Sequence, residues 1–200
     1  MRLFLIRHGA VSVAKPGSFY GGTEVALSTQ GRLEAQKAAF QVEPITFAAV
    51  YASPLGRAQY GAQCVVASRP GMQVRTLDGL KEISRGRWIG LTANEVDVQF
   101  PGDLQFHRQD PWDWRAHGGE SLGDLRDRVL MARDTILREQ DSDAEVALIS
   151  HMFPTRAILA DAMGLDLPAW NELRIDTGSV SLVEYGCNGD AKVIFAGRIS

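Results

Sequence analysis

The stretch Leu3-Phe4-Leu5-Ile6-Arg7-His8-Gly9 decides the fold of this chain. Its four apolar residues predict a short strand that is buried on both faces, as strands of a parallel sheet are. Arg7 and His8 would lie at the carboxyl end of that strand, where open α/β sheets bind their ligands. An arginine fork fits phosphate bidentately, and a neutral imidazole can act as a nucleophile. The stretch therefore predicts a phosphoryl-transfer site.

Three further apolar stretches each precede a residue that could take part in the same phosphoryl-transfer site. The expected strand 47–51 leads to Arg57, 72–77 leads to Glu82, and 145–149 leads to His151. Because parallel strands end at one edge of the sheet, we expect these side chains to converge with Arg7 and His8. A single histidine after a strand is more often a structural hydrogen-bonding residue. The prediction of an active site therefore rests on the convergence of all five side chains.

Strand and helix patterns alternate along the chain and predict a three-layer α/β/α sandwich with a mostly parallel central sheet. Helices are expected at about 28–40, after Pro54, at 121–140 and at about 154–163, and a hairpin at 180–195. The inner face of the first helix is expected to carry Leu33, Ala35, Ala38 and Ala39. We expect residues 1–200 to form one domain.

The pattern weakens at about 84–120, where we expect an irregular, aromatic-rich insert. It holds Trp88, Phe100, Phe106, His107, Trp112, Trp114 and His117. Beside a site, such an insert would act as a lid or specificity cap. The alternative interpretation is a small hydrophobic cluster under a long loop.

Composition excludes several other classes of protein. Hydrophobic residues make up 45% and charged residues 22%, which is typical of a globular domain. A net charge of −3 argues against a broad nucleic-acid-binding surface. No stretch is apolar enough to span a membrane, and we expect no leader segment. Cys64 and Cys187 are too few for a disulfide framework, so a reducing cytoplasmic location is expected.

A phosphomonoester carries nearly two negative charges at neutral pH, since its second pKa is about 6. Arg7, Arg57 and a protonated His151 would supply the positive donors that bind it. His8 would attack phosphorus and form a phosphohistidine. Its other ring nitrogen needs a hydrogen-bond acceptor that fixes the tautomer, and the backbone carbonyl near Gly9 is the natural one.

Glu82 is the expected proton donor to the leaving group, and later the base that activates water. This role requires a raised pKa, through burial or negative neighbours. Because arginines neutralise the charge of the phosphate, the scheme requires no metal and no cofactor. A metallohydrolase is a weaker alternative, since His8 and His151 lack further ligands beside them.

These residues lie in a series of motifs that resembles the histidine phosphatase superfamily, the phosphoglycerate mutase-like proteins. The matching segments, in order, are Arg7-His8-Gly9, Tyr20-Gly21-Gly22-Thr23-Glu24, Leu27-Ser28, Gly31, Ser53-Pro54-Leu55-Gly56-Arg57-Ala58, Glu82, Gly86-Arg87-Trp88, Gly90-Leu91-Thr92, Gly118-Gly119-Glu120-Ser121 and Ser150-His151. The resemblance implies the phosphoglycerate mutase-like fold and a phosphohistidine on His8. It also implies a phosphate pocket of Arg7, Arg57 and His151, with Glu82 as proton donor.

The residues expected to contact the substrate are Gly9, Ser12, Tyr20, Gly21, Thr23, Glu24 and Met152. Many relatives carry an asparagine a few residues after the first motif, and Ser12 or Thr23 would take its place here. They also carry glycine after the second histidine, where this chain has Met152. A bulky residue there is expected to narrow or reshape the pocket.

The leading hypothesis is a metal-independent phosphatase for a small phosphomonoester. The Tyr20–Glu24 stretch and the short chain most resemble the α-ribazole phosphatase and broad-specificity branch. One alternative is a phosphoglycerate mutase, although such mutases are usually longer and have a closing tail, whereas this chain ends at Ser200. Another is an inert module that binds a phosphorylated ligand. The substrate is the one expected partner, with a homodimer left open.

Overall fold

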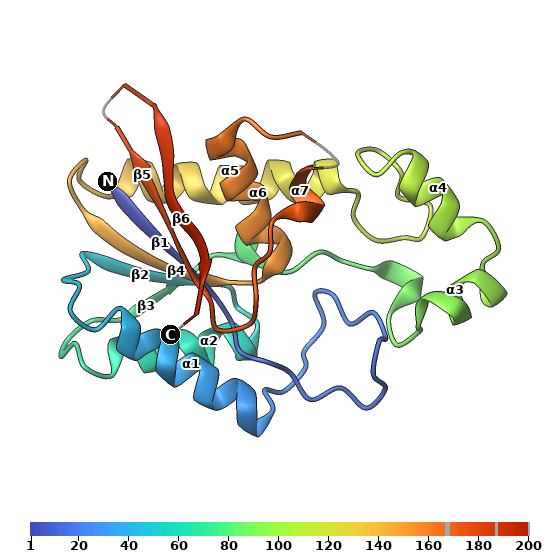
Figure 1. The fold of residues 1–200 in the computed structure, drawn as a ribbon, viewed down its shortest axis with the longest axis horizontal. Coiled ribbons are helices and arrows are strands. Elements are labelled where there is room, and N and C mark those ends of the chain that lie inside the picture. The colour runs from blue at the N-terminus through green and yellow to red at the C-terminus, as the bar shows by residue number, and fades with distance from the viewer. Residues whose placement is uncertain (167–168, 187, 200) are drawn as a thin grey trace.

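A six-stranded sheet lies at the centre of the computed structural model, which describes residues 1–166, 169–186 and 188–199 (Figure 1). The strands are β1 (Arg2–Arg7), β2 (Ala49–Ala52), β3 (Val74–Thr76), β4 (Glu145–Ser150), β5 (Val180–Tyr185) and β6 (Ala191–Arg198). Their spatial order is β3-β2-β4-β1-β5-β6. The first four run parallel, and β5 and β6 form an antiparallel hairpin on β1. The predicted mostly parallel sheet is therefore confirmed.

Helices cover both faces of this sheet, which confirms the α/β/α sandwich (Figure 1). One face carries α1 (Thr29–Gln41) and α2 (Gly56–Val66). The other carries α5 (Leu122–Glu139) and α6 (Met152–Met163), with the short α7 (Ala169–Glu172) beside them. Two short 3₁₀ helices follow β3: η1 (Asp78–Leu80) precedes the insert, and η2 (Gly86–Trp88) lies within it. The predicted hairpin residue Cys187 lies outside the described residues.

The apolar run of β1 faces two separate cores. Leu3 and Leu5 pack on the α5 and α6 side, whereas Phe4 and Ile6 pack on the α1 and α2 side. Successive side chains of a strand point to opposite faces, so a strand covered on both faces must be apolar at every position. This is the physical reason for the continuous hydrophobic run that predicted the fold.

The inner face of α1 differs from the prediction at one residue. Ala35, Ala38 and Ala39 are buried as expected, but the side chain of Leu33 is half exposed. The buried stripe of this helix begins at Gly31. At about 100° per residue, Leu33 lies roughly 200° around the helix from that glycine and faces solvent.

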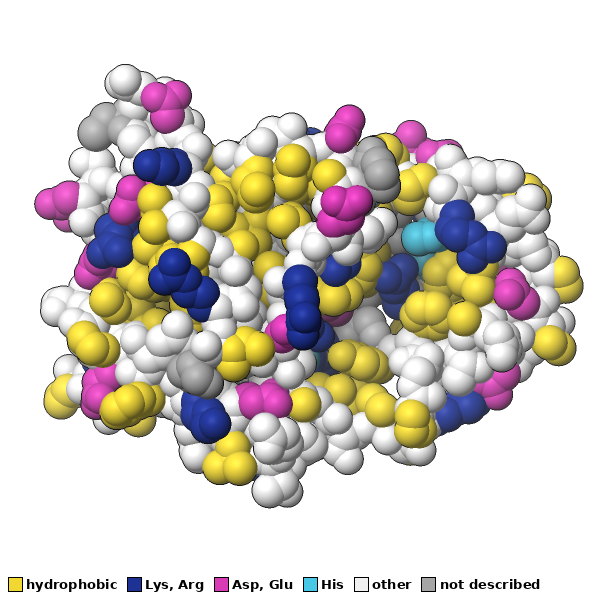
Figure 2. Space-filling model, in the orientation of Figure 1, with side chains coloured by type: hydrophobic (Ala, Val, Ile, Leu, Met, Phe, Trp, Pro, Cys, Tyr) yellow, Lys and Arg dark blue, Asp and Glu magenta, His cyan; other side chains and the backbone are white. Residues whose placement is uncertain are grey.

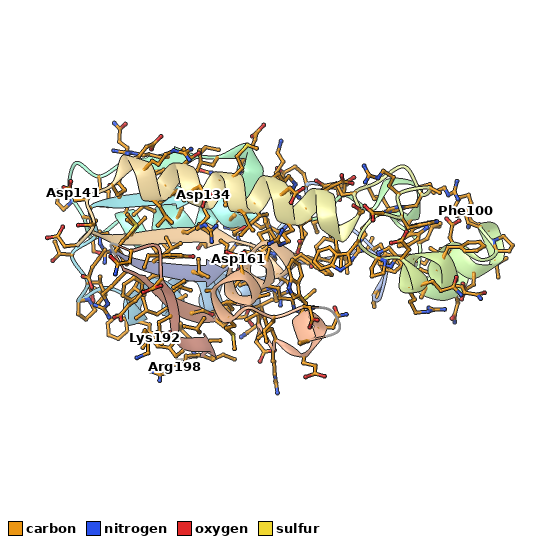
Figure 3. The ribbon with its side chains drawn as sticks, turned by 90° about the horizontal axis from the view of Figure 1, so that it is seen from above. Phe100, Asp134, Asp141, Asp161, Lys192 and Arg198 are labelled. Atoms are coloured by element: carbon orange, nitrogen blue, oxygen red, sulfur yellow. The ribbon has the colours of Figure 1, made fainter. Side chains whose placement is uncertain are left out.

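The insert is helical over much of its length, so the expectation of irregular structure at 84–120 is wrong there. It contains α3 (Ala93–Gln99) and α4 (Asp103–Gln109), each too short to show a clear hydrophobic period. A capping box between Thr92 and Glu95 starts α3. Figure 1 shows both helices set apart from the sheet, and Figure 3 places Phe100 at the far end of the insert.

A separate small core holds the insert together. Trp88, Val96 and Leu104 are buried in it, and Phe19 from the 8–28 segment packs against them. The carboxylate of Asp103 accepts hydrogen bonds from Arg87 Nη2 at 2.7 Å and from Trp88 Nε1 at 3.0 Å. Asp103 is 7% exposed, so these bonds lie in the interior of the insert. Within the described ranges, no helix has the length and apolarity needed to cross a bilayer.

Replacing Asp103 with Ala is expected to destabilise the insert, because it leaves the buried Trp88 N–H and the Arg87 guanidinium without their acceptor. The expected loss is about 2–3 kcal/mol in the free energy of unfolding. Urea titration followed by tryptophan fluorescence measures it. Asp97→Ala removes an exposed carboxylate from the same insert and serves as the control. Equal effects of the two substitutions would contradict this role of Asp103.

Candidate active site

The pairing of β1 with β4 brings His8 and His151 together. Arg7 lies opposite Ser150 in the parallel register, so the two histidines that follow leave the sheet side by side. Their ring centroids are 4.9 Å apart, at an interplanar angle of 61°. Both rings are almost fully buried, with exposed fractions of 2% for His8 and 0% for His151. The predicted convergence of these two residues is confirmed.

The tautomer of His8 is fixed by its neighbour. Its Nδ1–H donates to the carbonyl oxygen of Gly9 at 2.6 Å, and a carbonyl can only accept. Burial lowers the pKa of His8 to about 3, and the charges of Arg57 and Arg7 act in the same direction. The ring is therefore neutral near pH 7, and Nε2 carries a lone pair.

His151 is neutral as well in this structure, and its protonated form is expected only beside a bound phosphate. Arg57 Nε donates to its Nδ1 at 3.3 Å, so Nε2 carries the hydrogen and donates to Ser53 Oγ at 2.8 Å. Burial holds the pKa of His151 well below its ordinary value, and His8 and the nearby arginines lower it further. A phosphate dianion beside the ring would favour the protonated form.

Arg57 is oriented by the glycine-containing stretch that precedes α1. Its Nη2 donates to the carbonyl of Gly21 at 2.8 Å and its Nη1 to that of Thr23 at 2.7 Å. The guanidinium carbon lies 5.4 Å from the centroid of the Tyr20 ring. With Nε on His151, all three nitrogens have a partner, and each Nη keeps a second hydrogen for a ligand.

The other predicted substrate contacts make hydrogen bonds away from the histidines or make none. Glu24 accepts the N–H of Gly56 at 3.1 Å, at the start of α2. The hydroxyl of Thr23 donates back to the carbonyl of Tyr20. Ser12 is exposed, and within the described part of the chain its hydroxyl makes no hydrogen bond. Met152 begins α6 and is half-buried.

Arg7 adds a second positive charge beside His8. Its Nη1 donates to the carbonyl of Ile175, which anchors the side chain. Its Nε is enclosed and has no acceptor among the residues that the structure describes. An enclosed donor without a partner is costly, and a bound phosphate oxygen would satisfy it.

Glu82 faces these arginines from the loop after η1. Its side chain is 8% exposed, and burial raises the pKa of its carboxyl group. The N–H of Ile83, which bonds to Glu82 Oε1 at 2.9 Å, and the charges of Arg7, Arg85 and Arg57 partly oppose this rise. A raised pKa is what a carboxyl group needs to donate a proton near neutrality.

Residues that the sequence analysis missed hold the Glu82 loop in place. Arg128 of α5 donates to the carbonyls of Gly79 at 2.9 Å and Lys81 at 2.8 Å, and it pairs with Glu120. Ser150 Oγ donates to the carbonyl of Leu80 at 2.7 Å. An arginine within a helix gives no sequence signal for such a role. Ser53 was quoted among the matching motifs but was given no role; it follows β2 directly and contacts His151.

The space-filling view shows a hollow between the sheet region and the insert, with Lys and Arg side chains gathered along it (Figure 2). Among the described residues, no group of three or more His, Cys, Asp or Glu side chains is placed to hold a metal ion. The arginines are instead the available positive groups. The arrangement suits binding of a phosphate group and attack by His8.

Comparison with known proteins gives a family match over almost the whole chain. The sequence pattern of the histidine phosphatase superfamily (branch 1) matches residues 3–195. Phosphoserine phosphatase 1 of Hydrogenobacter thermophilus is 27% identical, over 92% of this chain and 86% of its own. Glucosyl-3-phosphoglycerate phosphatase of Mycolicibacterium vanbaalenii is 31% identical, over 84% of this chain and 77% of its own.

Solved structures show the same fold. Bacillus stearothermophilus YhfR superposes with a TM-score of 0.90 at 25% identity, covering 100% of this chain and 98% of its own. The α-ribazole phosphatase from Shigella flexneri superposes with a TM-score of 0.87 at 22% identity, covering 99% and 96%. At that identity the second likeness supports the fold alone.

Acid is expected to destabilise the protein through His8. The unfolded state takes up a proton below pH 6.5, but folded His8 has a pKa of about 3, so stability falls as the pH drops through this range. Between pH 7 and pH 5 the expected loss is about 2 kcal/mol. Chemical denaturation at both pH values measures this loss. His8→Gln lacks the titrating ring, so its stability should fall by about 2 kcal/mol less than that of the wild type between the two pH values. The same loss in both proteins would contradict the low pKa.

Proposed function

The chain belongs to the histidine phosphatase superfamily (branch 1) and is a phosphoric monoester hydrolase, and on that premise we propose that His8 is its nucleophile. One observation carries the proposal: the neutral His8 ring, held through Nδ1 by Gly9, lies beside His151 and within the field of Arg7 and Arg57. The substrate is a small phosphomonoester.

In the first step, His8 Nε2 attacks phosphorus opposite the ester oxygen. The P–N bond forms as the P–O ester bond breaks, and Glu82 transfers its proton to the departing oxygen. Arg7 and Arg57 bind the phosphoryl oxygens, and the dianion draws a proton onto His151. The products of this step are the free alcohol and phosphohistidine.

In the second step, water attacks the phosphohistidine and Glu82 accepts its proton. The P–N bond breaks, orthophosphate leaves, and His8 returns to its neutral state. One carboxyl group thus serves as acid and then as base, which a raised pKa allows. Mutase chemistry would use the same first step but return the phosphoryl group to an organic acceptor.

The insert at 84–120 acts in this proposal as a cap over the substrate. Its Arg85 lies against Phe19 of the 8–28 segment and Phe153 of α6, so the insert meets the rest of the site through that residue. We also propose that residues 1–200 form one domain. A cytoplasmic location stays a prediction of the sequence, and a homodimer is left open.

Phosphate release from a panel of phosphomonoesters, measured in chelator, tests the proposal directly. We expect turnover by the wild-type chain and none by His8→Ala, because among the described residues the lone pair of His8 Nε2 has no donor on it, whereas the Nδ1 lone pair of His151 accepts from Arg57 Nε. Acid-labile phosphate trapped on the protein should also require His8. Equal release by the two proteins would overturn the assignment of His8, and transfer to an added alcohol in place of water would favour a mutase.

Glu82→Gln is expected to lower kcat/KM for alkyl phosphates by about 10²- to 10⁴-fold, because the alkoxide then leaves without a proton. With p-nitrophenyl phosphate, Glu82→Gln should slow phosphoenzyme formation less, because the phenolate leaves without taking up a proton. With the wild type, alkyl phosphate hydrolysis should fall as the pH rises through the raised pKa of Glu82. Equal losses for both ester types would show that another group donates the proton.

A further inference from the structure

Arg128 of α5 binds the loop that carries Glu82 through the backbone of that loop. Its Nη1 donates to the carbonyls of Gly79 at 2.9 Å and Lys81 at 2.8 Å. Its Nη2 donates to the carbonyl of Glu82 itself at 3.3 Å. A Cβ atom on Gly79 would lie 2.8 Å from the backbone oxygen of Arg128, so the loop passes directly over α5. One side chain therefore binds three carbonyls within a short piece of chain.

The remaining donors of Arg128 bind Glu120, and this pair also reaches the far end of the loop. Arg128 Nε donates to Glu120 Oε1, and Nη2 donates to Glu120 Oε2 at 2.9 Å. Glu120 Oε2 also accepts the N–H of Ser84 at 2.8 Å. An arginine has five N–H donors, and here each of them has an acceptor. A lysine has three donors and no planar fork, so it could not make the same set of bonds.

Ser150 ties the same loop to the end of β4. Its Oγ donates to the carbonyl of Leu80 at 2.7 Å, and both residues are fully buried. With the bonds from Arg128, the consecutive carbonyls of residues 79–82 all accept from side chains of other elements. Apolar burial of Leu80 and Ile83 fixes the depth of the loop, but the hydrophobic effect is not directional. Hydrogen bonds are directional, so they determine how the peptide units of this loop are turned.

The carboxyl group of Glu82 depends on that backbone for its direction. Among the described residues it accepts one hydrogen bond, from the N–H of the adjacent Ile83 at 2.9 Å. Its position relative to His8 therefore follows from the conformation of residues 79–84. A misplacement of a catalytic group by about 1 Å can cost about 10²-fold in rate, so this conformation bears directly on proton transfer.

An indirect hold also leaves the carboxyl group able to carry a proton. A guanidinium in direct contact with Glu82 would favour its carboxylate form and lower its pKa. The charge of Arg128 is instead paired with that of Glu120, and the guanidinium groups whose charges lower the pKa of Glu82 belong to other arginines. Binding the carbonyls thus orients the acid without ionising it.

We propose that Arg128 and Ser150 are positioning residues for proton transfer, which fix the Glu82 carboxyl group beside the leaving-group oxygen by binding the backbone of its loop. This inference rests on the proposed function and assigns to its acid step two residues that do not touch the reacting atoms. Because both act through Glu82, their loss should impair reactions that need a proton donor and spare those that do not.

The test compares p-nitrophenyl phosphate with the alkyl phosphate that the wild type hydrolyses fastest. The measured quantity is the ratio of kcat/KM for the alkyl ester to kcat/KM for the aryl ester. Arg128→Met should lower this ratio about 10- to 100-fold, because a displaced acid no longer protonates the alkoxide. A loss of folded protein, or the effect of the Arg128 charge on His151, would change both rates alike and leave the ratio at its wild-type value.

A double-substitution cycle with Glu82 separates positioning from a structural role. Glu82→Gln alone should lower the ratio, as the proposed function requires. If Arg128 acts through Glu82, adding Arg128→Met to the Glu82→Gln protein should lower the ratio no further. An unchanged ratio in Arg128→Met, or a second drop of the same size in the double variant, would overturn the proposal.

Two arginine variants serve as controls. Arg126→Met removes another arginine of α5, which pairs with Asp127 and Asp161, and should keep the wild-type ratio. Arg128→Lys keeps the charge but not the fork, so its ratio should stay near that of Arg128→Met. Full restoration by lysine would show that the charge alone matters and would contradict the backbone hold.

Ser150→Ala provides a milder test that also applies if Arg128→Met does not fold, as judged by circular dichroism. It removes a single hydrogen bond and should lower the ratio by a smaller factor, about 2- to 10-fold. This drop should likewise vanish in the Glu82→Gln background. A wild-type ratio in Ser150→Ala would overturn its positioning role.

The Glu82→Gln protein distinguishes failure of this inference from failure of the proposed function. If Glu82→Gln keeps the wild-type ratio, the proton donor is another group and both proposals are wrong. If Glu82→Gln lowers the ratio but Arg128→Met and Ser150→Ala do not, the proposed function stands and the positioning inference alone fails.

Discussion

The parallel pairing of β1 with β4 is the constraint on which the rest of the site depends. It fixes Arg7 opposite Ser150, and therefore His8 beside His151. A shift by one residue would turn each side chain of the strand to the opposite face, so the two buried cores hold the register. The geometry of the reacting groups is thus a consequence of hydrophobic burial on both faces of the sheet.

Burial also sets the electrostatics of the site. Removing His8, His151 and Glu82 from water favours the neutral form of each, so the pKa values of the histidines fall and that of the carboxyl group rises. The same environment therefore keeps the His8 ring uncharged and favours the protonated carboxyl group of Glu82, as the proposed nucleophile and proton donor require. The arginines resist neutralisation, and the site keeps a net positive charge that suits a phosphate dianion.

The insert and the 8–28 segment form the side of the site that the sheet does not provide. Phe19 reaches the insert core, and its N–H bonds to the carbonyl of Leu91 at 2.9 Å. Arg128 and Glu120 hold the Glu82 loop from the opposite direction. Contacts of this kind tie the Glu82 loop and the insert to the sandwich.

The sequence by itself determined the sandwich, the mostly parallel sheet and the convergence of Arg7, His8, Arg57, Glu82 and His151. These follow from local periodicity and from the rule that parallel strands end at one edge. The two helices of the insert escaped prediction, since one or two turns give too few apolar repeats to detect.

Only the tertiary structure decided the lowered pKa of His151 and the support that Arg128 gives to the Glu82 loop. Each of these depends on which atoms meet across long sequence separations and how much water they exclude. A pattern along the chain encodes which face of an element is apolar, but it does not encode distances between partners or the desolvation that sets a pKa.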